Sequence, residues 1–329
     1  MSIRALLTLV VLAVSCAWAS GEEPQAAASG QEPQAKATGQ ETQGETPAPP
    51  APPASPPPLP FTTVEGNGGV FITPMAYLVN PSQGDQWLGL PSGVFSFASI
   101  GDKSFVSTGV TMTFFKRIEL GFAHESLGLG SWPKDVLKAT GMDLGTQTVR
   151  MNTFSLRGMI VEEQGWMPAV TVGAHFKFNE NIWDVDDDLG GACKALGVEK
   201  DEGWEGTLTV SKTFTGILPR PFILSVGIRN TDAAQTGLLG FTGHRDTVLE
   251  ANAVFFLTDR LLLGAEYRQK PDRLKRIPGL VGREDDWWTV CLGYIVNDRM
   301  TIAGGYGNFG NVLNHKENGV WALQVKYEF

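Results

Sequence analysis

The chain has few cysteines, no long apolar run and no excess of positive charge, and each shortage argues against a class of protein. Only 3 of its 329 residues are cysteines. Because Cys16 falls in the leader described below, Cys193 and Cys291 are too few for a disulfide scaffold. Beyond residue 20 no stretch of about twenty apolar residues occurs, so we predict no membrane-spanning helix. The net charge of -9 argues against nucleic acid as a partner, since phosphate binding needs clustered cations.

Recognisable cofactor motifs are missing as well. The sequence has no phosphate loop, zinc-ligand spacing or dinucleotide fingerprint, so we expect no cofactor. Asp184, Asp186 and Asp188 crowd one segment and are the only candidate metal ligands. Leu189 and Ala195 stand where an EF-hand loop needs glycine and glutamate, so that motif fails. We expect a solvated external loop there, or loose bridging of divalent ions to lipopolysaccharide.

The beginning of the chain is typical of an exported protein. Arg4 precedes the apolar residues 5–14, and the small-x-small triplet 17–19 is a cleavage site, so residues 1–19 are predicted to be a signal peptide. A lipid anchor on Cys16 is the alternative. Residues 20–60, rich in Gln, Ala and Pro, are predicted to be a disordered periplasmic linker.

The end of the chain alternates between apolar and polar residues with the period of a β-strand. A membrane barrel meets lipid on one face and water on the other, so such a strand needs no second layer of protein. Residues 93–329 are therefore predicted to form an all-β transmembrane antiparallel barrel of about twelve strands, with fourteen as the alternative. The predicted strands are 94–100, 105–115, 117–125, 148–160, 169–178, 204–214, 222–230, 247–257, 261–269, 287–296, 300–306 and 320–329.

The connections between these segments alternate between short and long. Tight turns such as 258–260 and 297–299 are followed by long joins such as 270–286 and 307–319. Outer-membrane barrels have short periplasmic turns and long extracellular loops, which is the pattern found here. Aromatic residues gather near the strand ends, as interfacial belts do; those expected at the outer interface are Trp204, Trp287, Trp288 and Trp321.

If the apolar face of each strand meets lipid, the alternation along the strand places a set of charged residues on the inward face. Both signs are present, so these side chains either line a constricted channel or pair with each other in a closed core. The same alternation turns Glu125, Glu205, Asn252, Lys326 and Glu328 inward. The candidate constriction residues are Glu119, Arg157, His175, Lys177, Arg229, Glu250, Glu266 and Arg268.

Residues 61–92 precede the first predicted strand and contain an apolar piece interrupted by Pro74. A central strand does not tolerate proline in its interior. We therefore expect this segment to fold into the lumen as a plug or to pair at the barrel seam. Two additional strands from this segment would make fourteen.

Several runs of the chain resemble one known family. Residues 237–241, 264–272 and 284–286, together with 68–69 and 73–74, are similar to an uncharacterised proteobacterial family known only as a domain of unknown function. The resemblance spans most of residues 65–329. It implies a bacterial envelope protein and gives no functional residues.

One triplet suggests an enzyme. His124 and Ser126 share a strand face that is predicted to meet lipid at the outer end, and Asn152 faces lipid at the outer end of the next strand. A serine, a histidine and a polar orienting group resemble the site of outer-membrane phospholipases and lipid A deacylases, but their flanking sequence is missing here.

These observations favour an outer-membrane barrel over a soluble protein. The predicted function is a narrow channel for passive or gated passage of small solutes, and the alternatives are a lipid hydrolase and a closed structural barrel. Expected partners are outer-membrane lipid, lipopolysaccharide, a small solute and the barrel-assembly machinery, for which Tyr327 and Phe329 are the predicted terminal signal.

Overall fold

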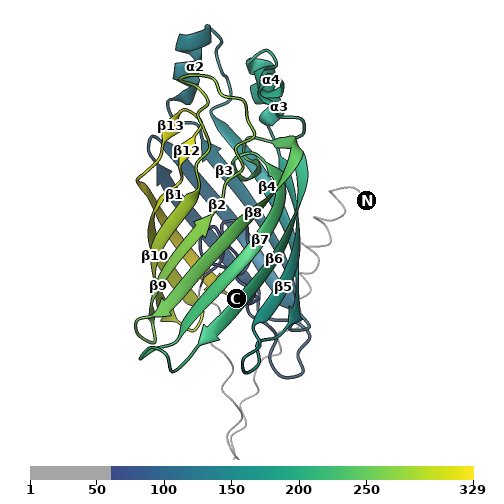
Figure 1. The fold of residues 1–329 in the computed structure, drawn as a ribbon, viewed down its shortest axis with the longest axis vertical. Helices are drawn as coiled ribbons and strands as arrows, with labels where there is room; N and C mark the ends of the chain where they lie inside the picture. The colour runs from purple at the N-terminus through teal and green to yellow at the C-terminus, as the bar shows by residue number, and fades with distance from the viewer. Residues whose placement is uncertain (1–60) are drawn as a thin grey trace, which may run out of the picture. The chain divides into compact units, whose positions relative to one another are not determined.

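A computed structural model describes residues 61–329 of the protein, and the predicted signal peptide and linker lie outside these residues. The described residues form one closed barrel of twelve antiparallel strands, in which the first strand pairs with the last. This confirms the predicted fold and the strand number of twelve (Figure 1). The barrel strands are β1 (Ser92–Ile100), β2 (Lys103–Phe114), β3 (Ile118–Gly128), β4 (Thr148–Val161), β5 (Ala169–Asn179), β6 (Glu202–Phe214), β7 (Phe222–Ala233), β8 (Phe241–Phe256), β9 (Leu261–Arg268), β10 (Trp287–Asn297), β11 (Met300–Asn308) and β14 (Val320–Glu328).

Alternation along each strand determines which side chains face outward. In β14 the side chains of Trp321, Leu323 and Tyr327 are exposed, whereas Gln324 and Lys326 are buried. One face of every strand therefore presents apolar side chains to the surroundings of the barrel, and the other faces a polar interior. Such a continuous apolar outer surface is unstable in water and belongs in hydrocarbon.

The two ends of the barrel differ in their connections (Figure 1). At one end the strands are joined by turns and short loops, for instance between β2 and β3 or between β8 and β9. At the other end, which we call the loop end, the long connections contain structure that the sequence analysis did not predict. These elements are α2 (Trp132–Thr140), α3 (Ile182–Asp188), α4 (Ala192–Leu196), the short 3-10 helix η1 (Gln235–Gly237) and the hairpin β12 (Asn311–Val312) with β13 (His315–Lys316).

The longest of these helices has local signals for both ends. Pro133 lies in the first turn of α2, where its missing N–H is not needed. Gly141 ends the helix with a φ of 76°, a left-handed conformation that glycine adopts without strain. Within residues 61–329 no helix is long and apolar enough to cross a membrane.

Most, but not all, of the predicted aromatic belt faces outward. Trp204, Trp288 and Trp321 are exposed by 60%, 42% and 65%. The prediction for Trp287 is wrong, because this ring is buried inside the barrel and stacks on Phe309 with a centroid distance of 4.7 Å. Two consecutive tryptophans on one strand must point to opposite faces, so only one of the pair can meet lipid.

Candidate functional site

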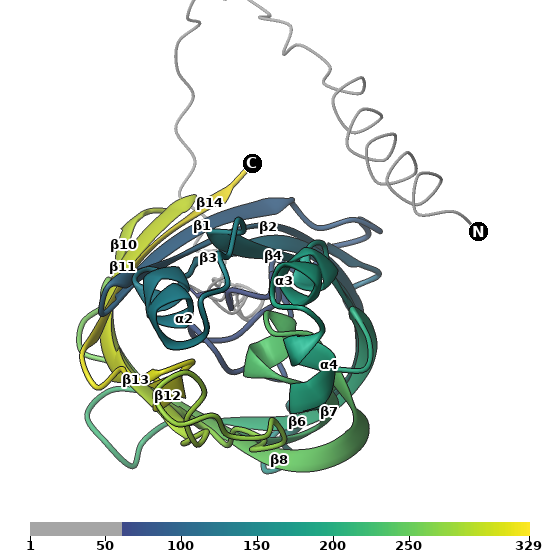
Figure 2. The same cartoon turned by 90° about the horizontal axis from the view of Figure 1, so that it is seen from above.

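The lumen of the barrel is filled by residues 61–80, which we call the inner segment. Nearly every residue in it is buried, and Figure 2 shows this part of the chain, in purple, inside the ring of strands. It forms no barrel strand and bends back on itself through bridges between Thr62 and Gly68 and between Gly69 and Pro74. Because β1 pairs directly with β14, the inner segment is not a strand of the seam.

A carboxylate of the wall binds the backbone of the inner segment. Glu266, on β9, accepts hydrogen bonds from the backbone N–H groups of Phe71, Ile72 and Thr73 at 2.9–3.1 Å. It also accepts the hydroxyl of Thr289 on β10, at 2.6 Å, and the hydroxyl of Thr73, at 2.8 Å. These donors need partners because no strand pairs with this bend of the chain. The wall therefore supplies the acceptor that an irregular backbone requires.

A second contact joins the inner segment to β3 and β4. Glu119 accepts the N–H of Val79 at 2.7 Å and pairs with Arg157 at 2.7 Å. Arg157 in turn donates to the carbonyl oxygens of Gly68, at 3.1 Å, and Met75. Both charged side chains are buried, so each offsets the desolvation of the other while they bind the segment between them.

The largest group of charges is centred on Glu65, a residue of the inner segment. Its carboxylate lies 2.9 Å from Lys177, 3.0 Å from Arg229 and 3.2 Å from Arg268. Glu205 and Glu250 of the wall complete the cluster, with Arg229 at 2.5 Å and 2.7 Å respectively. Three carboxylates thus balance three cations in a buried region, and one of the three belongs to the inner segment.

The structure places all eight candidate constriction residues inside the barrel, and all are buried. Seven of them contact the inner segment or the Glu65 cluster directly. His175 is the eighth: its Nε2 lies 3.1 Å from the Thr207 hydroxyl, while its Nδ1 has no partner. Glu125 is equally buried and accepts only the Thr153 hydroxyl, at 3.2 Å. These side chains form a closed polar core around the inner segment.

Toward the loop end the interior changes from charged to apolar. A cavity of about 60 Å³ lies between the inner segment and the long loops. Most of its lining is apolar and comes from the inner segment, the wall and the loops, with Phe71, Phe105, Leu127, Leu238, Trp287 and Val320 among the lining residues. The loops above it pack on one another through a shared apolar cluster that includes Trp132, Ile182 and Leu280.

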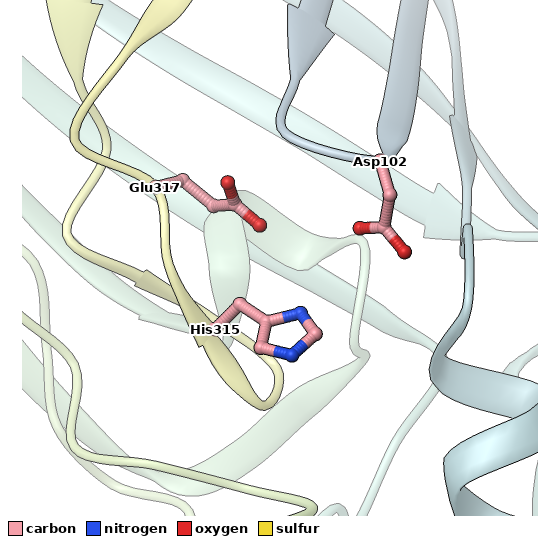
Figure 3. A group of neighbouring side chains, drawn as sticks. All are labelled: Asp102, His315 and Glu317. Atoms are coloured by element: carbon pink, nitrogen blue, oxygen red, sulfur yellow. The ribbon is translucent and has the colours of Figure 1, made fainter.

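Three possible metal ligands meet at the loop end: Asp102, His315 and Glu317 (Figure 3). The buried ammonium of Lys103 already lies between the two carboxylates, 3.1 Å from Asp102 and 3.0 Å from Glu317. Burial alone would raise the pKa of Asp102, but hydrogen bonds from Ser131 and Lys103 outweigh it and hold that pKa below its usual range. The group therefore functions as an ionic contact that joins the β1–β2 turn to two long loops.

Replacing Lys103 with Met is expected to loosen this contact, because it leaves two carboxylates facing each other without a cation. We expect trypsin to cleave at Lys134 and Lys138 of α2 roughly tenfold faster, which corresponds to about 1.4 kcal/mol of easier local opening. The control is Lys116→Met, in a turn at the opposite end. Equal cleavage rates in both variants would contradict the assigned role of Lys103.

The three aspartates considered as candidate metal ligands are not brought together around one point in residues 61–329. Asp184, Asp186 and Asp188 lie on α3, where an irregular loop was expected. Asp186 binds the Lys194 ammonium at 2.8 Å, and Asp188 accepts the N–H of Thr146 at 3.2 Å. Asp186 and Asp188 thus hold neighbouring protein segments.

The terminal and lipid-face candidates lie on the outer surface. Tyr327 and Phe329 are exposed and meet edge to face, with ring centroids 5.3 Å apart. His124 and Asn152 stand opposite each other on β3 and β4, and Nδ1 of the histidine lies 3.0 Å from Oδ1 of the asparagine. Ser126 follows on the same face of β3 and makes no hydrogen bond through its hydroxyl to any residue of 61–329.

The comparison with family models now identifies the chain. The model described as "Protein of unknown function (DUF3034)" matches residues 60–326. The chain belongs to that family. The match includes the inner segment and eleven complete strands of the barrel. No curated protein sequence matches the chain.

Solved structures that are similar to this protein include two porins and one enzyme. The KdgM porin has 10% identity and a TM-score of 0.42, and the match covers 72% of this chain and 99% of that one. The NanC porin has 9% identity and a TM-score of 0.44, with 73% and 100% covered. The outer membrane phospholipase A from Escherichia coli has 7% identity and a TM-score of 0.35, with 73% and 94% covered. At these values none of them assigns an activity to this family member.

Proposed function

We propose that the protein is an outer-membrane channel for small solutes and that the inner segment is a plug which closes it. The observation that supports this most directly is how the lumen is filled. The wall does not fill it alone, but presents Glu266, Glu119 and the cations around Glu65 to a separate stretch of chain. A twelve-stranded barrel is wider than the eight-stranded barrels that side chains alone can fill. Displacement of the inner segment would therefore leave an open passage.

Only noncovalent contacts hold the inner segment, so it can leave without bond breakage. Cys193 and Cys291 are both free thiols. The apolar cavity beyond the plug offers a transient binding position to a solute with an apolar part. Passage would require the inner segment to move and the apolar contacts between the long loops to separate.

The proposal includes an orientation. The apolar outer face and the outward tryptophans fit a membrane, and the short turns and long loops fit the periplasmic and extracellular sides of an outer membrane. Residues 20–60 would then be a periplasmic linker after removal of residues 1–19. Tyr327 and Phe329 would be the signal read by the barrel-assembly machinery, and lipopolysaccharide would surround the loop end.

Planar bilayer recordings test the channel. A side chain at Gly121 would overlap the carbonyl oxygen of Gly66, whereas one at Gly158 would meet nothing within 4 Å. We expect brief openings from the unaltered protein, longer and larger ones from Gly121→Val because it pushes the plug from the wall, and unchanged ones from Gly158→Val. If all three folded proteins stay silent, the channel is refuted and a closed structural barrel is the better assignment.

A further inference from the structure

A group of polar side chains stands on the outer face of β3 and β4, away from the lumen. His124 on β3 is directly opposite Asn152 on β4, and Ser126 is directly opposite Arg150. The intervening residues Glu125 and Met151 are buried inside the barrel, so these four point outward. None of them takes part in the plug or in the channel proposed above.

Hydrogen bonds fix the orientation of the histidine. The amide nitrogen of Asn152 donates to Glu180 at 2.7 Å, which turns its amide oxygen toward Nδ1 of His124, 3.0 Å away. An amide oxygen only accepts, so Nδ1 carries the proton and Nε2 is left as a base. A carboxylate oxygen of Glu180 also lies 3.9 Å from Nδ1 of His124. This is the arrangement by which a third group orients a catalytic histidine.

Ser126 is the third member of the group, and its hydroxyl forms no hydrogen bond within residues 61–329. Ser126 lies two residues beyond His124 on the same strand face, about 6.6 Å along the strand. Its hydroxyl has no partner among residues 61–329, so it is free to rotate toward Nε2. The hydrogen bond between a catalytic serine and its histidine is often long before substrate binds. Arg150, across the strand pair from Ser126, is exposed and forms no ion pair in the described part of the chain.

The depth of the group in the membrane is set by aromatic residues. Phe122, Phe154, Phe176 and Trp204 follow one another across β3, β4, β5 and β6 in register. Phe122 and Phe154 have ring centroids 4.9 Å apart, and Phe176 and Trp204 have centroids 5.0 Å apart. On the outward face, this aromatic row occupies the next position after His124 and Asn152, farther from the loop end. Aromatic belts mark the boundary between acyl chains and head groups, which is where lipid ester bonds lie.

We propose that Ser126, His124 and Asn152 form a serine esterase site for the acyl esters of membrane lipids. Nε2 of His124 takes the proton of the Ser126 hydroxyl as the oxygen attacks the ester carbonyl carbon. The lipid alcohol leaves with the proton from the imidazolium, and an acyl serine remains. Water then attacks the acyl serine with His124 again as base, which releases a fatty acid and restores the serine. Arg150 faces the developing oxyanion or the phosphate of the lipid.

The test uses the full-length mature barrel, with fatty-acid release measured separately from phosphatidylethanolamine vesicles and from lipopolysaccharide. We expect release from one of these, which distinguishes the two ester sources. Ser126→Ala and His124→Ala should reduce it by about 10³-fold or more. Ser99→Ala, a matched serine on the outward face of β1, should leave it unchanged. Asn152→Ala should reduce the rate, and Asn152→Asp should restore part of it, because a carboxylate also accepts from Nδ1.

A second readout does not depend on finding the right lipid. A fluorophosphonate probe reacts with an activated serine, so we expect it to label Ser126 in the unaltered protein and to fail in His124→Ala. Release that persists in Ser126→Ala would overturn the proposal, as would a folded protein that neither releases fatty acid nor takes the probe. Neither readout depends on ion conductance, so the site and the channel can fail independently.

Discussion

Replacing Glu65 with Ala is expected to destabilise the barrel by about 3–5 kcal/mol, because three buried cations lose their shared partner. Lys177, Arg229 and Arg268 all lie within 3.2 Å of this carboxylate, and Glu205 and Glu250 alone leave one positive charge uncompensated. Urea unfolding of the barrel in lipid vesicles measures the loss. In bilayers the same variant should conduct more often, since the inner segment loses its largest electrostatic contact.

Glu125→Gln is the matched control for this result. Glu125 is as buried as Glu65 but forms no ion pair within residues 61–329. Replacing its carboxylate with the glutamine amide should therefore change the free energy of unfolding little. The double variant Glu65→Ala with Lys177→Met should recover part of the stability, because the number of unpaired cations falls. If Glu65→Ala and Glu125→Gln unfold at the same urea concentration, the ion pairs of Glu65 do not hold the inner segment in place.

Replacing Leu323 with Arg is expected to cost about 2–4 kcal/mol of stability in a bilayer. Leu323 is 63% exposed and lies in the middle of β14, between the outward Trp321 and Val325. On a lipid-facing surface at this depth a guanidinium loses water without gaining a partner. The free energy of unfolding in vesicles of defined chain length gives the measurement.

Leu137→Arg serves as the comparison, since Leu137 on α2 is also exposed, by 45%, but lies on a loop-end helix. We expect a change within about 0.5 kcal/mol for that variant. A similarly small change for Leu323→Arg would mean that the apolar face of β14 meets water or protein instead of lipid, and the membrane location would have to be abandoned.

The strands could be predicted from the sequence because a lipid-exposed barrel repeats one simple rule in every segment. Apolar alternation located all twelve, and the same parity turned Arg157, Lys177 and Arg229 inward, where the structure buries them. The error at Trp287 came from assigning both adjacent tryptophans to the outer belt, although only one of two consecutive strand residues can face lipid. β8 begins at Phe241, earlier than the predicted residue 247, because its polar start pairs with the end of β7.

The partners of these residues could not be predicted, because they come from segments far apart in the chain. Glu65 lies outside every strand pattern, yet it is the shared anion of the central cluster. The helices of the long loops have too few turns for a clear periodic signal. The His124–Asn152 contact depends on the register of β3 with β4, and a shift by one residue would have turned one of them inward.

The seam between β1 and β14 has a consequence for the order of assembly. Thr62 binds Gln324 across 262 positions of sequence, and Thr73 binds Glu266 across 193. Within residues 61–329 the inner segment is synthesised first and its partners Glu266 and Gln324 much later, and the barrel cannot close before β14 has been made. Docking of that stretch and shutting of the ring therefore belong to one late, cooperative event, and a chain truncated before residue 320 should lose both together.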